Sequence, residues 1–185
     1  TAALIQDFFG LGVSEAAVIK ATQGAADMLE PTVQEIGLAI VRARTANSDE
    51  SGMRVANKLH WLHVLATDTL TWMALHPKRG FEAFESLGLL LQFRGVLVHD
   101  GWLAYKALEC EHALCNQHHL RELTYLLEEQ GQAWAGDIIH VLTHANHLDN
   151  RNCAEGRTPD YASQAYQGEV EALRDLYTAI LAHAQ

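Results

Sequence analysis

The sequence predicts an α/β protein with a single mixed β-sheet and additional helices at both ends of the chain. Three observations predict it. Residues 53–76 hold β-branched and aromatic runs separated by short turns, residues 96–99 form a short apolar strand, and both ends of the chain have helical apolar periodicity. At 185 residues, with 49% hydrophobic residues, the chain is long enough to bury a substantial core.

The N-terminal part is predicted to be helical. Residues 1–9 indicate a short helix, and Ser14 is a typical N-cap for a second helix over 14–30. Pro31 suits the first turn of a third helix over 31–43. A short helix, a glycine-containing turn and a longer helix are typical of a helix-turn-helix, and equally of any helical hairpin.

Three antiparallel strands are expected next. The first contains 53–55 and ends at a turn over 56–58, and the second covers 59–65. A further turn at 67–69 leads into the third strand at 70–76. Two- and three-residue turns between strands are typical of an antiparallel meander.

The second half of the predicted sheet alternates helices with strands. A helix is expected over 80–92, a buried strand at 96–99, a short helix at 103–108 and a strand at 112–115. The resulting order β-β-β-α-β-α-β is that of the ribonuclease-H-like fold, in which the first and fourth strands lie side by side.

From Gln117 onward the pattern is helical, with a predicted loop at 149–159 and a last helix at 161–183. The sequence therefore predicts a ribonuclease-H-like core with N-terminal helices and a C-terminal helical insertion. The expected boundaries are 1–44 for the N-terminal helices, 45–130 for an incomplete catalytic core and 131–185 for the insertion.

Two aspartates are the leading candidates for a functional site. Asp49 precedes or lies within the first strand, and Asp100 ends the fourth, so both are expected in one cleft. Paired carboxylates favour Mg²⁺ or Mn²⁺, and two such ions can activate the attacking oxygen and stabilise the leaving one in phosphoryl transfer. Both aspartates can also be interpreted as ordinary turn residues. Glu50 is the reserve first acid, although strand alternation places it opposite Asp49.

A cluster of cysteines and histidines is the second candidate site. Cys110, His112, Cys115 and His118 are of the types that hold Zn²⁺ tetrahedrally, although the spacings around the histidines do not match a standard zinc finger. In a strand, residues 112 and 115 point to opposite faces, which opposes shared ligation. The alternative is that these histidines orient carboxylates or phosphate near the cleft.

Charge and composition limit the partners. With 13 basic and 23 acidic residues the net charge is −10, which excludes a free-standing DNA-binding module with a basic face. Phosphate contacts would have to come from a local patch, with Arg79 and Arg121 as candidates, or from another part of the protein. No transmembrane or signal segment is predicted, and three cysteines do not make a disulfide framework. The expected location is the cytoplasm.

Several motifs occur in a fixed order within residues 14–130. They are SDESGMRV at 48–55, LHWLHV at 59–64, KRG at 78–80, VHDGW at 98–102 and HALCNQHHLREL at 112–123. Together they resemble the insertion-sequence-66 transposases of bacteria. The last motif is the most distinctive, and Ser51 stands where the family usually has threonine.

This resemblance implies a DDE-type transposase that depends on Mg²⁺ (or Mn²⁺) and cuts and joins DNA strands. It implies Asp49 as the first catalytic acid and metal ligand and Asp100 as the second. The third acid, a glutamate, is expected beyond Gln185, so the fragment is expected to be inactive alone. Glu122 is the in-chain substitute, and the segment around Glu155 only imitates the family's third motif.

The resemblance also implies DNA partners, namely transposon ends and target, possible homo-oligomers and no membrane association. Two other functions stay open on the residues alone. One is a non-catalytic zinc-binding or protein-interaction module built on residues 110–119, and the other is a general ribonuclease-H-like nuclease that uses the same acids.

Overall fold

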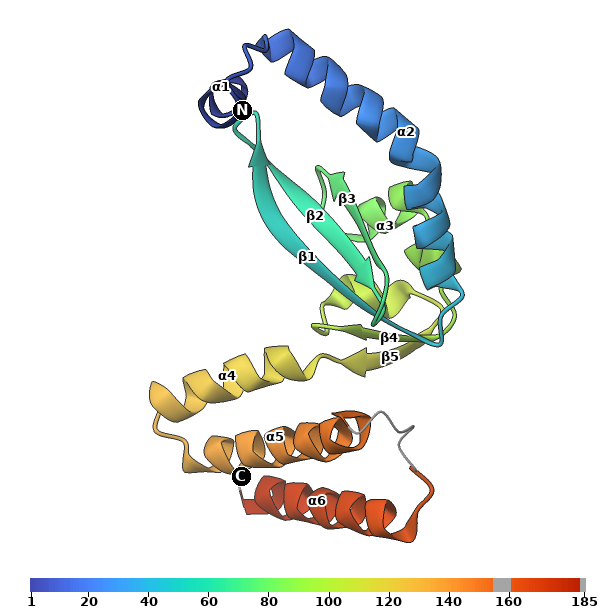
Figure 1. The fold of residues 1–185 in the computed structure, drawn as a ribbon. Helices are drawn as coiled ribbons and strands as arrows, with labels where there is room; N and C mark the ends of the chain where they lie inside the picture. Colours follow the sequence, from blue (N-terminus) through green and yellow to red (C-terminus); the bar gives the residue numbers. More distant parts are fainter. Residues whose placement is uncertain (155–160, 184–185) are drawn as a thin grey trace. The chain divides into compact units, whose positions relative to one another are not determined.

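The computed structural model describes residues 1–154 and 161–183. It divides into two compact units, Thr1–Leu114 and Cys115–Gln185, whose elements are labelled in Figure 1. The first unit contains the sheet and the second is helical.

The first unit is built on a five-stranded mixed sheet. Its strands are β1 (Thr45–Val55), β2 (Lys58–Ala66), β3 (Thr71–His76), β4 (Val96–His99) and β5 (Glu111–Leu114). The spatial order is β3-β2-β1-β4-β5, with antiparallel β1–β2 and β2–β3 pairs and parallel β1–β4 and β4–β5 pairs. This is the ribonuclease-H-like arrangement, and the predicted pairing of the first and fourth strands is confirmed.

Strand β1 begins eight residues earlier than the first predicted strand segment, so Asp49 lies inside it. Its first half alternates strictly, with Ala46, Ser48 and Glu50 buried and the residues between them exposed. The strand pairs with β2 from Asn47 to Val55 through a two-residue hairpin turn. Both turn residues, Ala56 and Asn57, have positive φ (48° and 64°), as the type I′ turns favoured in hairpins require.

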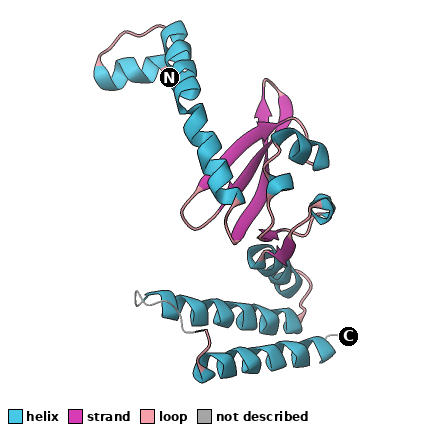
Figure 2. Cartoon of the chain, turned by 90° about the vertical axis from the view of Figure 1, so that its right-hand side faces the viewer, coloured by secondary structure: helices cyan, strands magenta, loops and turns pink. Residues whose placement is uncertain are grey.

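Two helices precede the sheet, α1 (Ala2–Phe9) and α2 (Glu15–Val41). The predicted helix boundary at Pro31 is wrong, because α2 continues through it. A proline inside a helix removes one hydrogen bond and costs about 3 kcal/mol, so tertiary packing must offset it. Ile40 is fully buried in the core near the end of α2, where that part of the helix lies along the sheet (Figure 2).

The connections around β4 are short helices: α3 (Phe81–Leu87), η1 (Leu90–Gln92) and η2 (Leu103–Ala107). The helix predicted over 80–92 ends at Leu87 because Gly88 adopts a left-handed conformation (φ 74°) and donates its N–H to the Phe84 carbonyl. Phe84, Phe93 and Tyr105 are completely or almost completely buried in the core beneath the sheet.

The second unit consists of α4 (Asn116–Glu128), α5 (Ala133–Ala154) and α6 (Gln164–His183), with α5 packed against both neighbours. The loop predicted from 149 is wrong up to residue 154, because α5 continues to Ala154 and Leu148 is still buried. Gly156 and Pro159 of that predicted loop lie outside the described residues. No helix in the described part of the chain is both long and apolar enough to cross a membrane.

Candidate active site

The parallel pairing of β1 with β4 ends shortly before the two predicted acids. Thr45 pairs with Val96 and Asn47 with Val98. Asp49 and Asp100 each follow this last pair by two residues in the sequence (47 + 2 and 98 + 2). Asp49 is exposed on β1, where its Oδ1 accepts the Glu50 N–H at 2.8 Å, and Asp100 directly follows β4.

The Asp100 carboxylate is held at both oxygens. Its Oδ1 accepts the backbone N–H of Trp102 at 2.8 Å, which closes a local turn of the kind aspartate favours. Its Oδ2 accepts Arg79 Nη2 at 3.1 Å. The Asp100 side chain is 20% exposed, so it stays accessible from solvent.

Arg79, in the segment between β3 and α3, joins Asp100 to a second carboxylate. Its Nε donates to Glu50 Oε2 at 3.3 Å. The guanidinium carbon lies 4.2 Å from the ring centre of Trp102 and 5.1 Å from that of Trp61. Such cation–π contacts and the two ion pairs hold the planar group in one orientation.

Glu50 is the buried end of this network, with a side chain only 1% exposed. The Tyr105 hydroxyl forms a short hydrogen bond to Glu50 Oε1 and lies 3.0 Å from Ser48 Oγ. Burial raises the pKa of Glu50, while the hydrogen bonds from Tyr105 and Arg79 and the Arg79 charge act in the opposite direction. Burial also raises the pKa of Tyr105, so its hydroxyl stays protonated and can donate.

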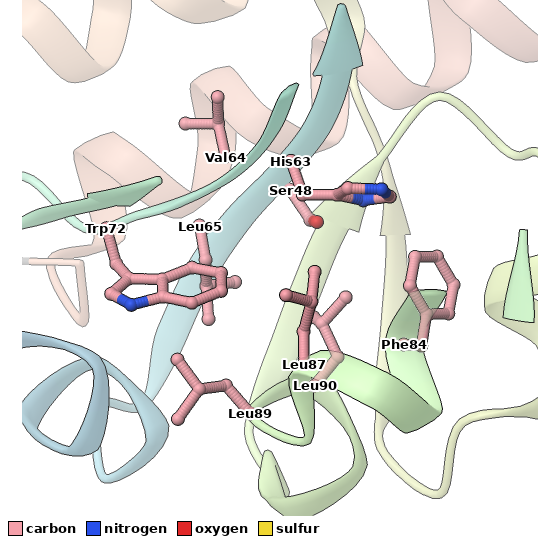
Figure 3. Close-up of a pocket in the computed structure, with 9 residues that line it drawn as sticks. All are labelled: Ser48, His63, Val64, Leu65, Trp72, Phe84, Leu87, Leu89 and Leu90. Atoms are coloured by element: carbon pink, nitrogen blue, oxygen red, sulfur yellow. The ribbon is translucent and has the colours of Figure 1, made fainter. Parts of the chain in front are cut away.

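His63 lies beside Glu50 above a small, mostly apolar cavity of about 10 Å³ (Figure 3). Its Nε2 faces the Lys78 carbonyl at 3.1 Å, so Nε2 carries the proton and donates. Its buried Nδ1 has no hydrogen-bond partner among the described residues and lies 3.9 Å from Glu50 Oε1. Burial lowers the pKa of His63, which keeps the ring neutral.

A chain of two histidines fixes the turn after Asp100. The Gly101 N–H donates to His99 Nδ1 at 3.0 Å, so the proton of His99 is on Nε2. That Nε2 donates to His112 Nδ1 at 3.0 Å, and His112 Nε2 then faces the Leu108 carbonyl at 3.3 Å as a donor. Burial lowers the pKa of His99 and so favours the neutral ring that this chain of bonds requires.

The predicted zinc cluster is divided between the two units. Cys110 and His112 belong to the first, where Cys110 is a free thiol and His112 is bonded to His99. Cys115 and His118 belong to the second. Within the described residues, no three or more His, Cys, Asp or Glu side chains are grouped so that they could hold a metal ion. The structure therefore gives the zinc hypothesis no support.

The remaining candidates from the sequence are Arg121, Glu122 and Glu155. Arg121 and Glu122 are exposed on α4, in the second unit. Glu155, in the segment that imitates the third motif, lies outside the described residues. Sequence reasoning missed the Glu50–Arg79–Asp100 connection, because only the strand alternation that buries Glu50 was visible in the sequence.

Comparisons with known proteins agree with the motif analysis. Residues 1–184 match the family model described as "Transposase IS66 family". No curated protein matches the sequence.

Similar solved structures include the HTLV-2 integrase catalytic core domain in complex with magnesium. Its dimeric form is 15% identical over 46% of this chain and 72% of that chain, at a TM-score of 0.32. Its trimeric form is 14% identical over 75% of this chain and 82% of that one, also at 0.32. A chain of the simian T-cell lymphotropic virus intasome in complex with PP2A regulatory subunit B56 gamma is 15% identical. The match covers 46% of this chain and 42% of that chain, at a TM-score of 0.31.

Proposed function

The chain belongs to the IS66 family of DDE-type transposases, and we propose that Asp49 and Asp100 are the acids with which it acts on DNA. The observation that supports this assignment is the parallel pairing of β1 with β4, whose last observed pair, Asn47 with Val98, lies two residues before Asp49 and Asp100. The two acids come from strands that are neighbours in space and 51 residues apart in the sequence (100 − 49).

The donor set fits a divalent cation. Carboxylate oxygens are the ligands that Mg²⁺ and Mn²⁺ prefer, and Asp49 and Asp100 both keep solvent access. If the two ionised carboxylates lie close together, as proposed, they repel each other, and a shared cation would relieve that repulsion. When bound, Mg²⁺ or Mn²⁺ would supply charge stabilisation at the reacting phosphate.

The proposed reaction is in-line displacement at a DNA phosphodiester. In the first step water attacks phosphorus and the bond to the leaving oxygen breaks, which frees a 3′-hydroxyl at the transposon end. In the second step this hydroxyl attacks a phosphodiester of the target DNA: a bond forms between the transposon 3′ oxygen and the target phosphorus, and the bond from that phosphorus to the target's own 3′ oxygen breaks, which leaves a target 3′-hydroxyl. The protein contributes mainly positioning and charge neutralisation in such reactions.

We also propose a domain organisation for the chain and DNA partners for the transposase. Residues 1–44 would be N-terminal helices, 45–130 the core and 131–185 an insertion. The DNA partners would be transposon ends and target, bound by a homo-oligomer in the bacterial cytoplasm. With a net charge of −10, the phosphate contacts would come from local patches of the chain or from another part of the protein.

The decisive experiment replaces each acid by its amide in the transposase that carries this chain. Asp49→Asn and Asp100→Asn should each abolish strand transfer and leave binding of transposon ends intact. Asp68→Asn is the matched control, because Asp68 is an exposed aspartate in the turn between β2 and β3. Strand transfer retained by either amide variant would remove that acid from the proposal.

A further inference from the structure

The orientation of the Asp100 side chain depends on Glu50, a buried residue to which it is connected through Arg79. Arg79 bonds Asp100 Oδ2 through Nη2 and Glu50 Oε2 through Nε, so one rigid guanidinium spans two carboxylates. The Glu50 side chain is 1% exposed, whereas that of Asp100 is 20% exposed. The buried carboxylate is therefore the fixed end of the bridge and the accessible one is the end that is positioned.

Glu50 is fixed by contacts that come from distant parts of the first unit. Tyr105 in η2 hydrogen-bonds its Oε1, and Arg79 from the segment before α3 bonds its Oε2. Both oxygens of Asp100 are hydrogen-bonded too, but only the Glu50 carboxylate is closed to solvent as well. Because β1 alternates, Glu50 and Ser48 lie on the buried face, and Asp49 lies on the other. Glu50 is consequently poorly placed to share a ligand with Asp49.

The surroundings of Arg79 hold its guanidinium group between the two carboxylates. Trp102 and Trp61 lie against the guanidinium, and Trp102 also donates its backbone N–H to Asp100 Oδ1. Arg79 is 30% exposed and has already committed donors to two carboxylates. Lysine could not reproduce this arrangement, because a single ammonium cannot span two carboxylates in a fixed plane.

We propose that Glu50 and Arg79 form a positioning pair that holds the Asp100 carboxylate in its working orientation, and that neither residue binds metal or DNA phosphate. This inference rests on the proposed role of Asp100. Enzymes commonly lose about 100-fold in rate when a reacting group is misplaced by about 1 Å, so the pair should matter for turnover rather than for DNA binding.

The test is a double-mutant cycle in the transposase that carries this chain, with Glu50→Gln, Arg79→Lys and the double variant. Each single change should lower kcat for strand transfer about 10- to 100-fold and leave the KM for transposon-end DNA within about threefold. Residues that act as one unit are not additive, so the double variant should be no slower than the slower single variant.

Glu82→Gln is the matched control. Glu82 pairs with Lys78, the neighbour of Arg79, at 3.8 Å, but both side chains are largely exposed (72% and 64%). It should leave kcat, KM and the other readouts unchanged.

Two readouts on the 185-residue chain do not depend on activity. Mn²⁺ titration followed by electron paramagnetic resonance should show that Glu50→Gln weakens binding in the native chain but causes no further loss beyond about threefold in the Asp100→Asn chain, because Glu50 acts through Asp100. The side-chain Nε–H signal of ¹⁵N-labelled Arg79 should exchange with water faster in Glu50→Gln. This signal tests the ion pair in the native chain as well, so the proposal is still tested if a variant transposase folds poorly.

Three results would overturn the proposal. A further loss of Mn²⁺ binding when Glu50→Gln is added to Asp100→Asn would make Glu50 a metal ligand in its own right, and a raised KM with unchanged kcat in Arg79→Lys would make Arg79 a DNA contact. Additive losses in kcat would show that the two residues act separately. Failure of the proposed function gives a different pattern, because Asp100→Asn would then retain strand transfer whatever the cycle shows.

Discussion

His99 and His112 are joined directly through their rings, His99 Nε2 to His112 Nδ1 at 3.0 Å. The Gly101 N–H on one side and the Leu108 carbonyl on the other leave only one arrangement of protons for the two neutral rings. The His99 ring also stacks on Tyr105, with ring centres 4.4 Å apart. The pair therefore connects the turn that presents Asp100 to the core of the first unit.

The first prediction is that His112→Ala weakens this connection. His99 Nε2 loses the acceptor of a partly buried hydrogen bond, and a typical hydrogen bond contributes about 0.5–1.5 kcal/mol net, so the free energy of unfolding should fall by about that amount. Urea unfolding followed by tryptophan fluorescence measures it, because three of the four tryptophans lie in the first unit. The ¹⁵N shifts of His99 should show the Nε2–H tautomer in both proteins, because the Gly101 N–H still donates to Nδ1 in the variant. An Nδ1–H tautomer in the native chain would contradict the proton arrangement, and His147→Ala, at an exposed histidine of α5, serves as control.

A second prediction concerns pH. The pKa of His63 is lowered from its ordinary 6.5, so the unfolded chain takes up a proton before the folded one. The contribution of neutral His63 to the stability of the fold is complete above pH 6.5. It is lost as the pH falls below that value towards the lowered pKa. His99 acts in the same direction. Glu50 acts oppositely, because its pKa is raised above 4.5 and its contribution is lost as the pH rises through the raised value.

His63→Gln separates the share of His63. The glutamine amide can still donate to the Lys78 carbonyl that His63 Nε2 faces, but it does not titrate. We expect the free energy of unfolding to fall less steeply between pH 7 and pH 5.5 than in the native chain, as measured by urea unfolding at several pH values. An equal slope in both proteins would show that His63 is not the titrating group.

A third prediction tests the support of Glu50. Tyr105→Phe removes the hydroxyl group that donates a hydrogen bond to Glu50 Oε1 and lies beside Ser48 Oγ. Glu50 and Ser48 are both buried. A hydrogen bond to a charged group contributes about 1.5–3 kcal/mol, and the free energy of unfolding should fall by about that much. Tyr125→Phe is the control, because Tyr125 is 57% exposed. Equal stability of both variants would mean that the Tyr105 hydroxyl contributes no net stabilisation.

The sheet could largely be predicted from sequence, whereas the network beneath it could not. Strand β4 is a local pattern, an apolar run that stops at an aspartate and a glycine, and it was predicted at its observed bounds of Val96 and His99. Strand β1 was predicted too short, because its buried positions include Ser48 and Glu50. Those polar groups are satisfied by Tyr105 and Arg79, 55 and 29 residues away from Glu50. Local hydrophobicity contains no information about such distant partners.

Pro31 shows the same limitation for a helix. Its local signal favours a helix start, yet α2 continues through it because the end of the helix packs into the core around Ile40. The roles of Asp49 and Asp100 remain a prediction. The sequence could place both acids on neighbouring strands, but the contacts of Arg79 with Glu50 and Asp100 required coordinates.

The last prediction concerns the parallel register of β1 with β4, the strands that lead to Asp49 and Asp100. Gly95 precedes β4, and the next residue, Val96, donates its N–H to the Arg44 carbonyl at 2.9 Å just before β1 begins. A Cβ at Gly95 would lie 2.8 Å from the Ala43 carbonyl oxygen and closer still to that of Arg44, and both are backbone atoms that cannot rotate away. Only a residue without a side chain allows β1 and β4 to start this close together.

Gly95→Ala should therefore lower the free energy of unfolding by about 1–3 kcal/mol or more, because overpacking usually costs that much. It should also slow strand transfer, because the shift in β4 moves Asp100 relative to Asp49. Gly24→Ala is the matched control: nothing lies within 4 Å of its Cβ position in α2, and alanine should stabilise that exposed helix by about 0.5–1 kcal/mol. Urea unfolding and the strand-transfer assay measure the two effects. Native stability and activity in Gly95→Ala would show that the register does not depend on this close approach.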